Sequence, residues 1–204
     1  MEHYFTIDQP SFAEFKDRGS KFLAFAYPIK TALEFKKHLQ NLKKEHPKAV
    51  HHCFAYRLGF TGDEFRSSDD GEPSGSAGKP ILGQIDSKKL CNVAVIVVRY
   101  FGGSLLGVPG LINAYKTASV LALQMVPTIK KPITIQLKIE FDYQLINDVM
   151  IIVKLCQCNI ISQEINLFSN LTLEVPKSKE KEVVFRFADI KNLIILPEKS
   201  KKAK

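Results

Sequence analysis

Hydrophobic and polar residues recur along this chain with spacings that predict two successive blocks of secondary structure. In the first block, apolar residues three or four positions apart indicate two helices, and β-branched or alternating apolar runs indicate three strands. The predicted elements are a strand at residues 21–29, a helix capped by Thr31 and ended by His46-Pro47, strands at His51–Leu58 and Leu90–Tyr100, and a helix from Pro109 to Met125.

The pattern starts again after residues 126–132, where Val-Pro-Thr-Ile-Lys-Lys-Pro has the proline and charge content of a connector. The elements predicted beyond it are a strand at 133–139, a helix at 145–156, strands at 160–167 and 171–175 joined by a hairpin at Phe168-Ser169-Asn170, a helix at 183–190 and a strand at 192–196. This βαββαβ order predicts a ferredoxin-like domain. The fold class is therefore α+β, with two domains at residues 1–126 and 133–198 and a basic tail at 199–204.

The composition is that of a globular protein, because 45% of the 204 residues are hydrophobic and 25% are charged. The longest apolar run, Val93–Val98, is far shorter than the roughly 20 residues of a membrane-spanning helix. We therefore expect no membrane partner and, since the first residues lack the pattern of an export signal, a cytoplasmic protein. Four scattered cysteines predict buried, reduced thiols, and we expect neither a metal nor another cofactor.

The formal charge of +8 is unevenly distributed along the chain. Residues 1–126 carry 16 Lys and Arg against 12 Asp and Glu, residues 127–198 carry nine of each, and residues 199–204 add four lysines. A basic protein of this kind is attracted to phosphate polymers, and such binding would decline steeply with salt. Because basic tails are common in proteins without a nucleic-acid partner, the charge permits RNA binding without establishing it.

Residues 66–80 form the most polar segment and overlap an unusually long loop predicted for residues 59–78. Asp69, Asp70 and Glu72 place three carboxylates within four positions, which suits a hard cation or an acid with a raised pKa. The spacing does not match a calcium-binding loop. The interpretation we favour is a turn-rich connection, in which aspartate and serine bond the backbone locally and Pro80 begins a helix.

Residues 99–110 lead from the buried strand into the start of the next helix and carry several glycines. Backbone N–H groups near a helix start, together with the Arg99 guanidinium, suit a phosphate or carboxylate. The glycine spacing matches neither a P-loop nor a dinucleotide fold, and close packing of the turn is an equal alternative. His51 precedes Cys53 on one face of a predicted strand, with His52 on the other, and His51 is placed to face the acidic segment.

Three ordered motifs resemble the YigZ/IMPACT family: residues 46–59, HPKAVHHCFAYRLG; residues 68–75, SDDGEPSG; and residues 97–103, VVRYFGG. The resemblance covers most of residues 15–125. It implies a first domain like the fourth domain of elongation factor G and a second domain like that factor's fifth. One departure from the family pattern is at Val108-Pro109-Gly110-Leu111-Ile112-Asn113, where a glycine and an arginine are absent. Loss of that arginine weakens an anion site at the helix start unless Lys116 substitutes for it.

The resemblance implies a non-catalytic binding or regulatory protein linked to translation, with RNA, the ribosome or a translation-associated protein as its partner. The alternative is an enzyme that acts on a small phosphorylated or carboxylated substrate held between segments 66–80 and 99–110. If those two segments line one cavity with His51, the enzyme alternative gains support. No catalytic or metal-binding residues are assigned, and the candidate binding residues are His51, Arg66, Asp69, Asp70, Glu72, Ser74, Gly75, Arg99, Tyr100, Gly102, Gly103 and Lys116.

Overall fold

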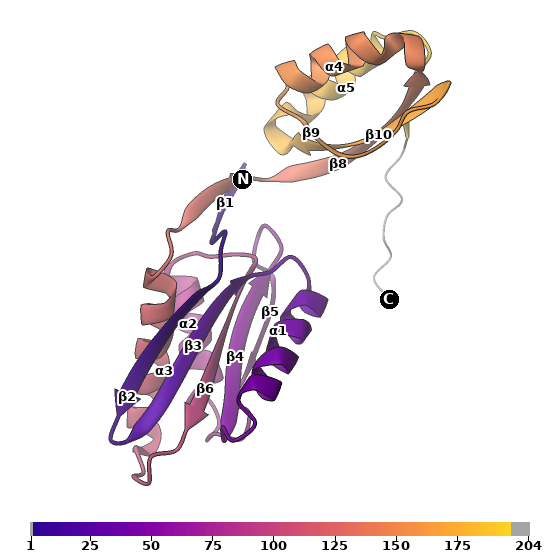
Figure 1. Cartoon of the computed structure of the whole chain (residues 1–204). Helices are drawn as coiled ribbons and strands as arrows, with labels where there is room; N and C mark the ends of the chain where they lie inside the picture. Colours follow the sequence, from indigo (N-terminus) through magenta and orange to yellow (C-terminus); the bar gives the residue numbers. More distant parts are fainter. Residues whose placement is uncertain (1, 197–204) are drawn as a thin grey trace. The chain divides into compact units, whose positions relative to one another are not determined.

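The chain folds into two compact units in the computed structural model, which describes residues 2–196 (Figure 1). One unit comprises residues 3–131, and the other comprises residues 132–196 together with Glu2. The division falls at the end of the connector predicted at 126–132. Each unit has its own hydrophobic core, as the α+β prediction requires.

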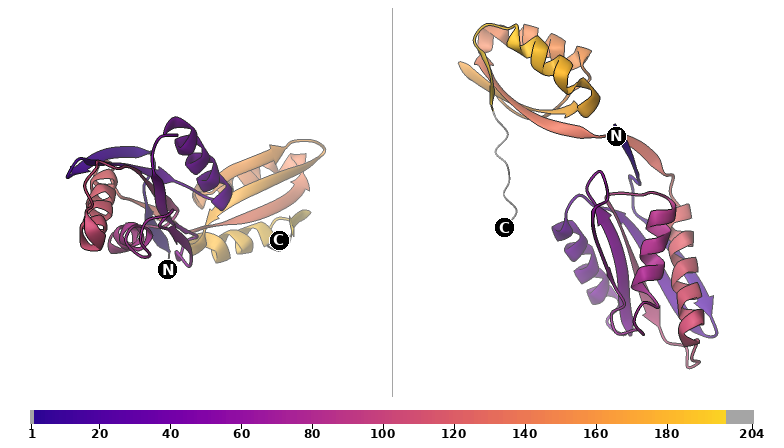
Figure 2. Two further views of the ribbon diagram at one scale, coloured as in Figure 1. Left: turned by 90° about the horizontal axis from the view of Figure 1, so that it is seen from below. Right: turned by 180° about the vertical axis from the view of Figure 1, so that it is seen from behind.

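The first unit is built on a five-stranded antiparallel sheet. Its order is β2 (Ser11–Asp17), β3 (Ser20–Pro28), β6 (Val93–Tyr100), β4 (His51–Leu58) and β5 (Glu64–Ser68). Helix α1 (Ala32–Glu45) lies on one face, and α2 (Gly78–Ser87) and α3 (Gly107–Gln124) lie on the other (Figure 2). A separate two-stranded sheet pairs β1 (His3–Thr6) with β7 (Ile129–Pro132).

Strand β6 occupies the middle of the sheet, which explains its β-branched composition. Val93, Val95 and Val97 belong to the core under α2 and α3, whereas Ile96 and Val98 belong to the core under α1. A strand covered on both faces has no polar side to present. Helix α1 begins where its cap predicts, because the Thr31 hydroxyl oxygen accepts a hydrogen bond of 3.2 Å from the backbone N–H of Glu34.

Several elements differ from the sequence prediction. Strands β1, β2, β5 and β7 are additional, and β5 interrupts the loop expected at residues 59–78. Helix α2 begins at Gly78, two residues before Pro80, and α3 begins at Gly107. Strand β5 carries a polar, exposed sequence at the edge of the sheet, where backbone pairing with β4 alone makes it a strand.

The second unit confirms the predicted βαββαβ order. Its elements are β8 (Thr134–Asp142), η1 (Tyr143–Leu145), α4 (Ile146–Leu155), β9 (Asn159–Glu164), β10 (Phe168–Pro176), η2 (Lys177–Lys179), α5 (Glu180–Ala188) and β11 (Leu193–Leu196). The antiparallel sheet has the order β11-β8-β10-β9, and both α-helices cover the same face (Figure 1). This is the ferredoxin-like arrangement.

The predicted hairpin is present between β9 and β10, but the position of its turn at Phe168-Ser169-Asn170 was wrong. These three residues begin β10 and pair with β8, so the turn lies just before them at residues 165–167. Polar Ser169 is fully buried in the strand, and its hydroxyl donates to the Asn166 carbonyl at 2.9 Å, a contact that serves the preceding turn. Residues 197–198 of the predicted second domain and the tail at 199–204 lie outside the described residues. Within residues 2–196, no helix has the length and apolar character to cross a bilayer.

Candidate functional site

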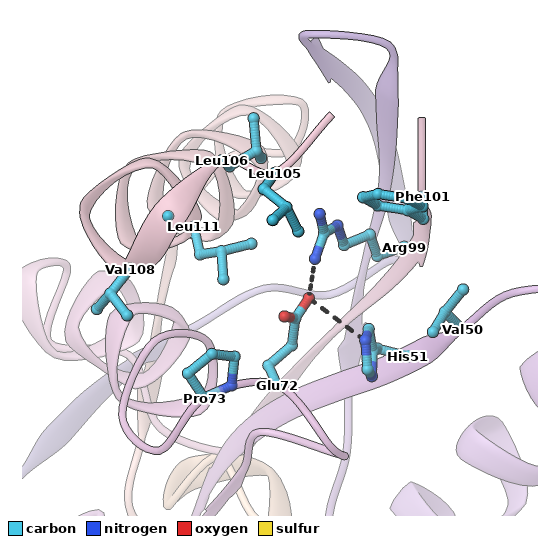
Figure 3. A pocket seen from close by; sticks show the side chains of 11 residues that line it. Val50, His51, Glu72, Pro73, Arg99, Phe101, Leu105, Leu106, Val108 and Leu111 are labelled. Carbon is cyan, nitrogen blue, oxygen red and sulfur yellow. Dashed lines mark hydrogen bonds and ion pairs between the residues drawn. The ribbon is translucent and has the colours of Figure 1, made fainter. Parts of the chain in front are cut away.

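The two segments singled out in the sequence meet at one cavity of about 400 Å³ in the first unit (Figure 3). Its polar lining consists of His51, Glu72 and Arg99. Its remaining lining comes from Val50, Pro73, Phe101, Leu105, Leu106, Gly107, Val108 and Leu111. The cavity therefore has a small charged floor within mostly apolar walls, which is the usual composition of a ligand-binding site.

Strand pairing brings the polar residues together. His51 at the start of β4 is the register partner of Arg99 near the end of β6, so their side chains project from the same face of the sheet. Glu72 follows β5 and reaches the same place from the loop before α2. The apolar wall comes from the loop after β6 and the first turns of α3.

Glu72 is the centre of a buried hydrogen-bond network. Its Oε1 atom accepts from Arg99 Nη1 at 2.6 Å and from the Tyr115 hydroxyl at 2.7 Å, and His51 Nε2 lies 3.8 Å away. The Glu72 and Arg99 side chains are 3% and 7% exposed. Burial raises the pKa of Tyr115, so its hydroxyl stays protonated and donates to the carboxylate. A buried charge pair with further hydrogen bonds is strongly held in one geometry.

Neighbouring groups extend this network. The Cys53 thiol donates to the Asp69 carbonyl at 2.9 Å and lies 3.3 Å from the Tyr115 hydroxyl. Burial raises the pKa of Cys53, so the thiol is protonated and unreactive. His51 Nδ1 donates to the Asp70 carbonyl at 2.7 Å, which orients Nε2 toward Glu72.

The three acidic residues of segment 66–80 do not converge. Asp69 accepts backbone N–H bonds from Gly75, Ala77 and Gly78 at 2.8–3.0 Å, and thereby shapes the loop that leads into α2. Asp70 accepts from the backbone N–H of His52 at 2.7 Å. Only Glu72 reaches the cavity. Within residues 2–196, no group of three His, Cys, Asp or Glu side chains is placed to hold a metal ion.

Burial by itself raises the pKa of Asp69, but the hydrogen bonds from Gly75, Gly78 and Ala77 outweigh that effect and leave the pKa below its ordinary value. Asp69 is thus a charged residue with a structural role, as the turn-rich interpretation of this segment expects.

The two glycines after β6 serve the backbone, Gly102 by allowing close packing and Gly103 by its positive φ. A Cβ atom on Gly102 would lie 1.9 Å from the backbone carbon of Gly19 and 2.2 Å from the nitrogen of Ser20, so no other residue fits there. Gly103 has a φ of +87°, a conformation that favours glycine. Neither Gly102 nor Gly103 belongs to the lining of the cavity.

The remaining candidate residues lie away from the cavity. Arg66 on β5, Ser74 in the loop and Lys116 on α3 are exposed, and none of them is part of the lining. Gly75 has a φ of +76° and bonds Asp69. Tyr100 projects to the α1 side of the sheet, where its hydroxyl lies 2.9 Å from His46 Nδ1. Asn113, at the position of the absent family arginine, is also exposed.

Sequence reasoning missed Tyr115 and the exposed apolar rim of Val50, Phe101, Leu105 and Val108. Tyr115 lies on the buried, apolar face of α3. A tyrosine hydroxyl on such a face needs a buried hydrogen-bond partner, and this need is the signal that the sequence offered. Leu105 is 85% exposed, and the spacing of apolar residues in this loop does not predict that exposure.

Comparison with known proteins gives consistent relatives. Residues 18–123 match the family model "Impact N-terminal domain". The chain is 32% identical over 176 residues to the IMPACT family member YigZ of Escherichia coli, which covers 85% of each chain, and 34% identical to an IMPACT family member of Haemophilus influenzae, which covers 72% of each. A crystal structure of a hypothetical protein superimposes with a TM-score of 0.76 at 29% identity, covering 98% of this chain and 100% of that one.

Proposed function

Because the chain belongs to the IMPACT family, we propose that it is a non-catalytic binding protein with a regulatory role in translation, and that its partner docks at the cavity between segments 66–80 and 99–110. The link to translation is supported by the family resemblance. The docking site is supported by the cavity itself.

The apolar rim carries the proposal. Val50, Phe101, Leu105 and Val108 are 57%, 48%, 85% and 46% exposed, and all four surround one opening (Figure 3). Single exposed apolar residues are normal on a protein surface, but a group of them around a cavity exposes area that a partner can bury. Such a rim favours a protein partner.

The polar floor also favours binding over acid–base chemistry. The single carboxylate of the floor is neutralised by Arg99 and accepts from Tyr115, so it is not poised as a free base. Asp69 and Asp70, the other two acids considered for catalysis, are engaged by backbone N–H groups.

An RNA partner receives less support from the second unit. The outer face of its two central strands presents Gln136, Lys138, Glu140, Thr172 and Glu174. Base-stacking sheets of this topology use aromatic side chains at the centre of that face. The centre of this face is polar and bears more acidic than basic groups among these residues, and Phe168, which is exposed on the same face, lies at the first position of β10 and not at the centre. This arrangement disfavours single-stranded RNA.

A pull-down with the full chain tests the proposal. Cytosolic extract, with and without nuclease treatment, is passed over the wild-type protein, Leu105→Asp and Leu33→Asp; Leu33 is 63% exposed on α1 and lies outside the cavity lining, so it is a matched control. We expect a translation-associated protein to be retained by wild type and Leu33→Asp after nuclease treatment, and lost with Leu105→Asp. Capture that nuclease abolishes, or that Leu105→Asp leaves unchanged, contradicts the proposal.

The enzyme alternative keeps one specific observation in its favour, because the two segments do line one cavity with His51. A substrate with a phosphate or carboxylate would stabilise the native state and raise the melting temperature. Thermal shift with inorganic phosphate and with acetate tests this directly. A rise in melting temperature that Leu105→Asp removes would favour the enzyme, whereas a binding protein of the proposed kind predicts no change with either anion.

A further inference from the structure

One carboxylate oxygen on the cavity floor lacks a protein partner. All contacts of Glu72 with Arg99, Tyr115 and His51 go to Oε1, and Oε2 accepts no hydrogen bond from any of the described residues. Among residues 2–196, the side-chain N and O atoms that are fully buried and lack a hydrogen-bond partner are His52 Nε2 and Arg99 Nε. Glu72 Oε2 is not one of them, so this oxygen is not fully buried and keeps access to the cavity. Figure 3 shows it turned away from Arg99 and His51. An acceptor in this position is open to a donor from a ligand.

The start of a helix also lies at the cavity. Leu106, Gly107 and Val108 belong to its lining and form the start of α3, which is 18 residues long. No side chain caps this helix, no acidic residue lies in its first turn, and the backbone N–H groups of Gly107 and Val108 donate to no described residue. A helix start of this kind presents partial positive charge to an acceptor.

The net charge of the floor sets the chemical class of the ligand. Glu72 and Arg99 form a 2.6 Å ion pair, so each charge is already balanced. A phosphate would bring negative charge into the cavity, where only the helix start and His51 remain to interact with it. A neutral group with both an N–H and a C=O matches the unpaired oxygen and the unpaired amides without leaving a charge buried.

We infer that the cavity holds an extended peptide segment of the partner protein, anchored by one bulky apolar side chain. This inference deepens the proposed function and rests on it. The backbone N–H of the segment donates to Glu72 Oε2, and its carbonyl accepts from the Gly107 and Val108 amides. The apolar side chain packs on Leu105, Leu111 and Phe101. A volume of about 400 Å³ accommodates one large side chain with its backbone.

Titration of the full chain with capped pentapeptides, followed by amide NMR, tests the inference. The probes are acetyl-Ala-Ala-X-Ala-Ala-amide with X as Leu, Lys or Asp, added to about 10 mM, tenfold above a dissociation constant of about 1 mM. We expect the Gly107 and Val108 amide resonances to shift with X as Leu, and the affinity to fall at least about tenfold with Lys or Asp, because a charge would enter apolar walls.

Two variants complete the test. Leu105→Asp should abolish the shifts, and Leu33→Asp should preserve them. The inference is overturned if the leucine peptide leaves Gly107 and Val108 unmoved, or if inorganic phosphate shifts them at lower concentration than the peptide does. A partner captured in the pull-down through Leu105 while the peptides have no effect would sink this inference and leave the proposed function standing. Failure of the wild-type chain to capture such a protein would instead contradict the proposed function.

Discussion

At the scale of single residues, the site depends on a charge pair that is costly to break. Glu72 and Arg99 are both almost fully buried and contact one another at 2.6 Å. Removing one member of such a pair leaves the other charged and desolvated, whereas replacing both with apolar residues restores a compatible interior.

Glu72→Leu should therefore destabilise the first unit by about 3–5 kcal/mol, and Arg99→Met by a similar amount. The double variant should lie within about 2 kcal/mol of wild type, because neither charge then remains unpaired. Urea unfolding of the four proteins measures the coupling. If the double variant instead loses as much unfolding free energy as the two single variants together, the two side chains contribute through separate contacts, and the predicted coupling is contradicted.

Asp69 gives a pH-dependent prediction. Its pKa is below its ordinary value in the folded state, so the stability that it confers is complete above the unfolded value of about 3.9 and is lost as pH falls through the lower, folded pKa. Asp69→Asn should cost about 1–3 kcal/mol at pH 7, because three backbone N–H groups lose a charged acceptor.

The difference in unfolding free energy between wild type and Asp69→Asn should narrow as the pH falls below about 4. Asp63→Asn, at an exposed position just before β5, is the control and should change stability little. A difference that stays constant from pH 7 to pH 3 would argue against a charged Asp69 in the native loop.

The types of residue in the sequence were enough to select the side chains of the site. They were not enough to predict the role of each side chain. His51, Glu72 and Arg99 were selected from their chemistry and lie together in the structure. The sequence could not separate Glu72 from Asp69, because which backbone N–H groups approach a carboxylate is decided by the fold of the loop. Tyr115 joins the network across 43 residues of chain, a distance that no local pattern spans.

At the scale of elements, the glycine at the end of β6 fixes how close two loops approach. A Cβ on Gly102 would overlap the backbone of Gly19 and Ser20, which cannot move aside as a flexible side chain can. The turn between β2 and β3 therefore packs directly on the loop that carries Phe101 and Leu105 to the cavity.

Gly102→Ala should destabilise the first unit by at least about 3 kcal/mol, since backbone must shift to make room. Gly83→Ala is the matched control, because Gly83 lies within α2 with nothing within 4 Å of its added Cβ. That change should stabilise by about 0.5–1 kcal/mol through helix propensity. Thermal melts of both variants measure the difference in stability. Similar melting temperatures for Gly102→Ala and Gly83→Ala would contradict the prediction.

Elements with a strong period were predictable, and edge strands were not. The apolar stripes of α1, α3 and α4 and the continuous run of β6 carry their own evidence in the sequence. Strand β5, with the sequence Glu-Phe-Arg-Ser-Ser, has no apolar alternation and becomes a strand because β4 lies beside it. The strand forms through a tertiary contact, so the local sequence of the loop could not predict it.

At the scale of the whole molecule, the two units expose different kinds of surface. The first unit exposes an apolar rim around its cavity, and the second exposes a sheet face whose centre is polar. Composition and net charge alone gave no sign of this division, because a charge of +8 concerns non-specific attraction and not the shape of a site. The exposed apolar rim, and not the net charge, therefore indicates the kind of partner.

The most direct measurement is site-specific photocrosslinking with p-benzoylphenylalanine placed at position 105 or, as control, at position 33, in the full chain and in nuclease-treated cytosolic extract. Both positions are exposed in the folded protein, so neither substitution disturbs the core. A protein adduct at 105 and none at 33, suppressed by excess of the leucine pentapeptide, is the predicted result. Equal adducts at both positions, or no protein adduct at 105, would contradict a docking site at the cavity.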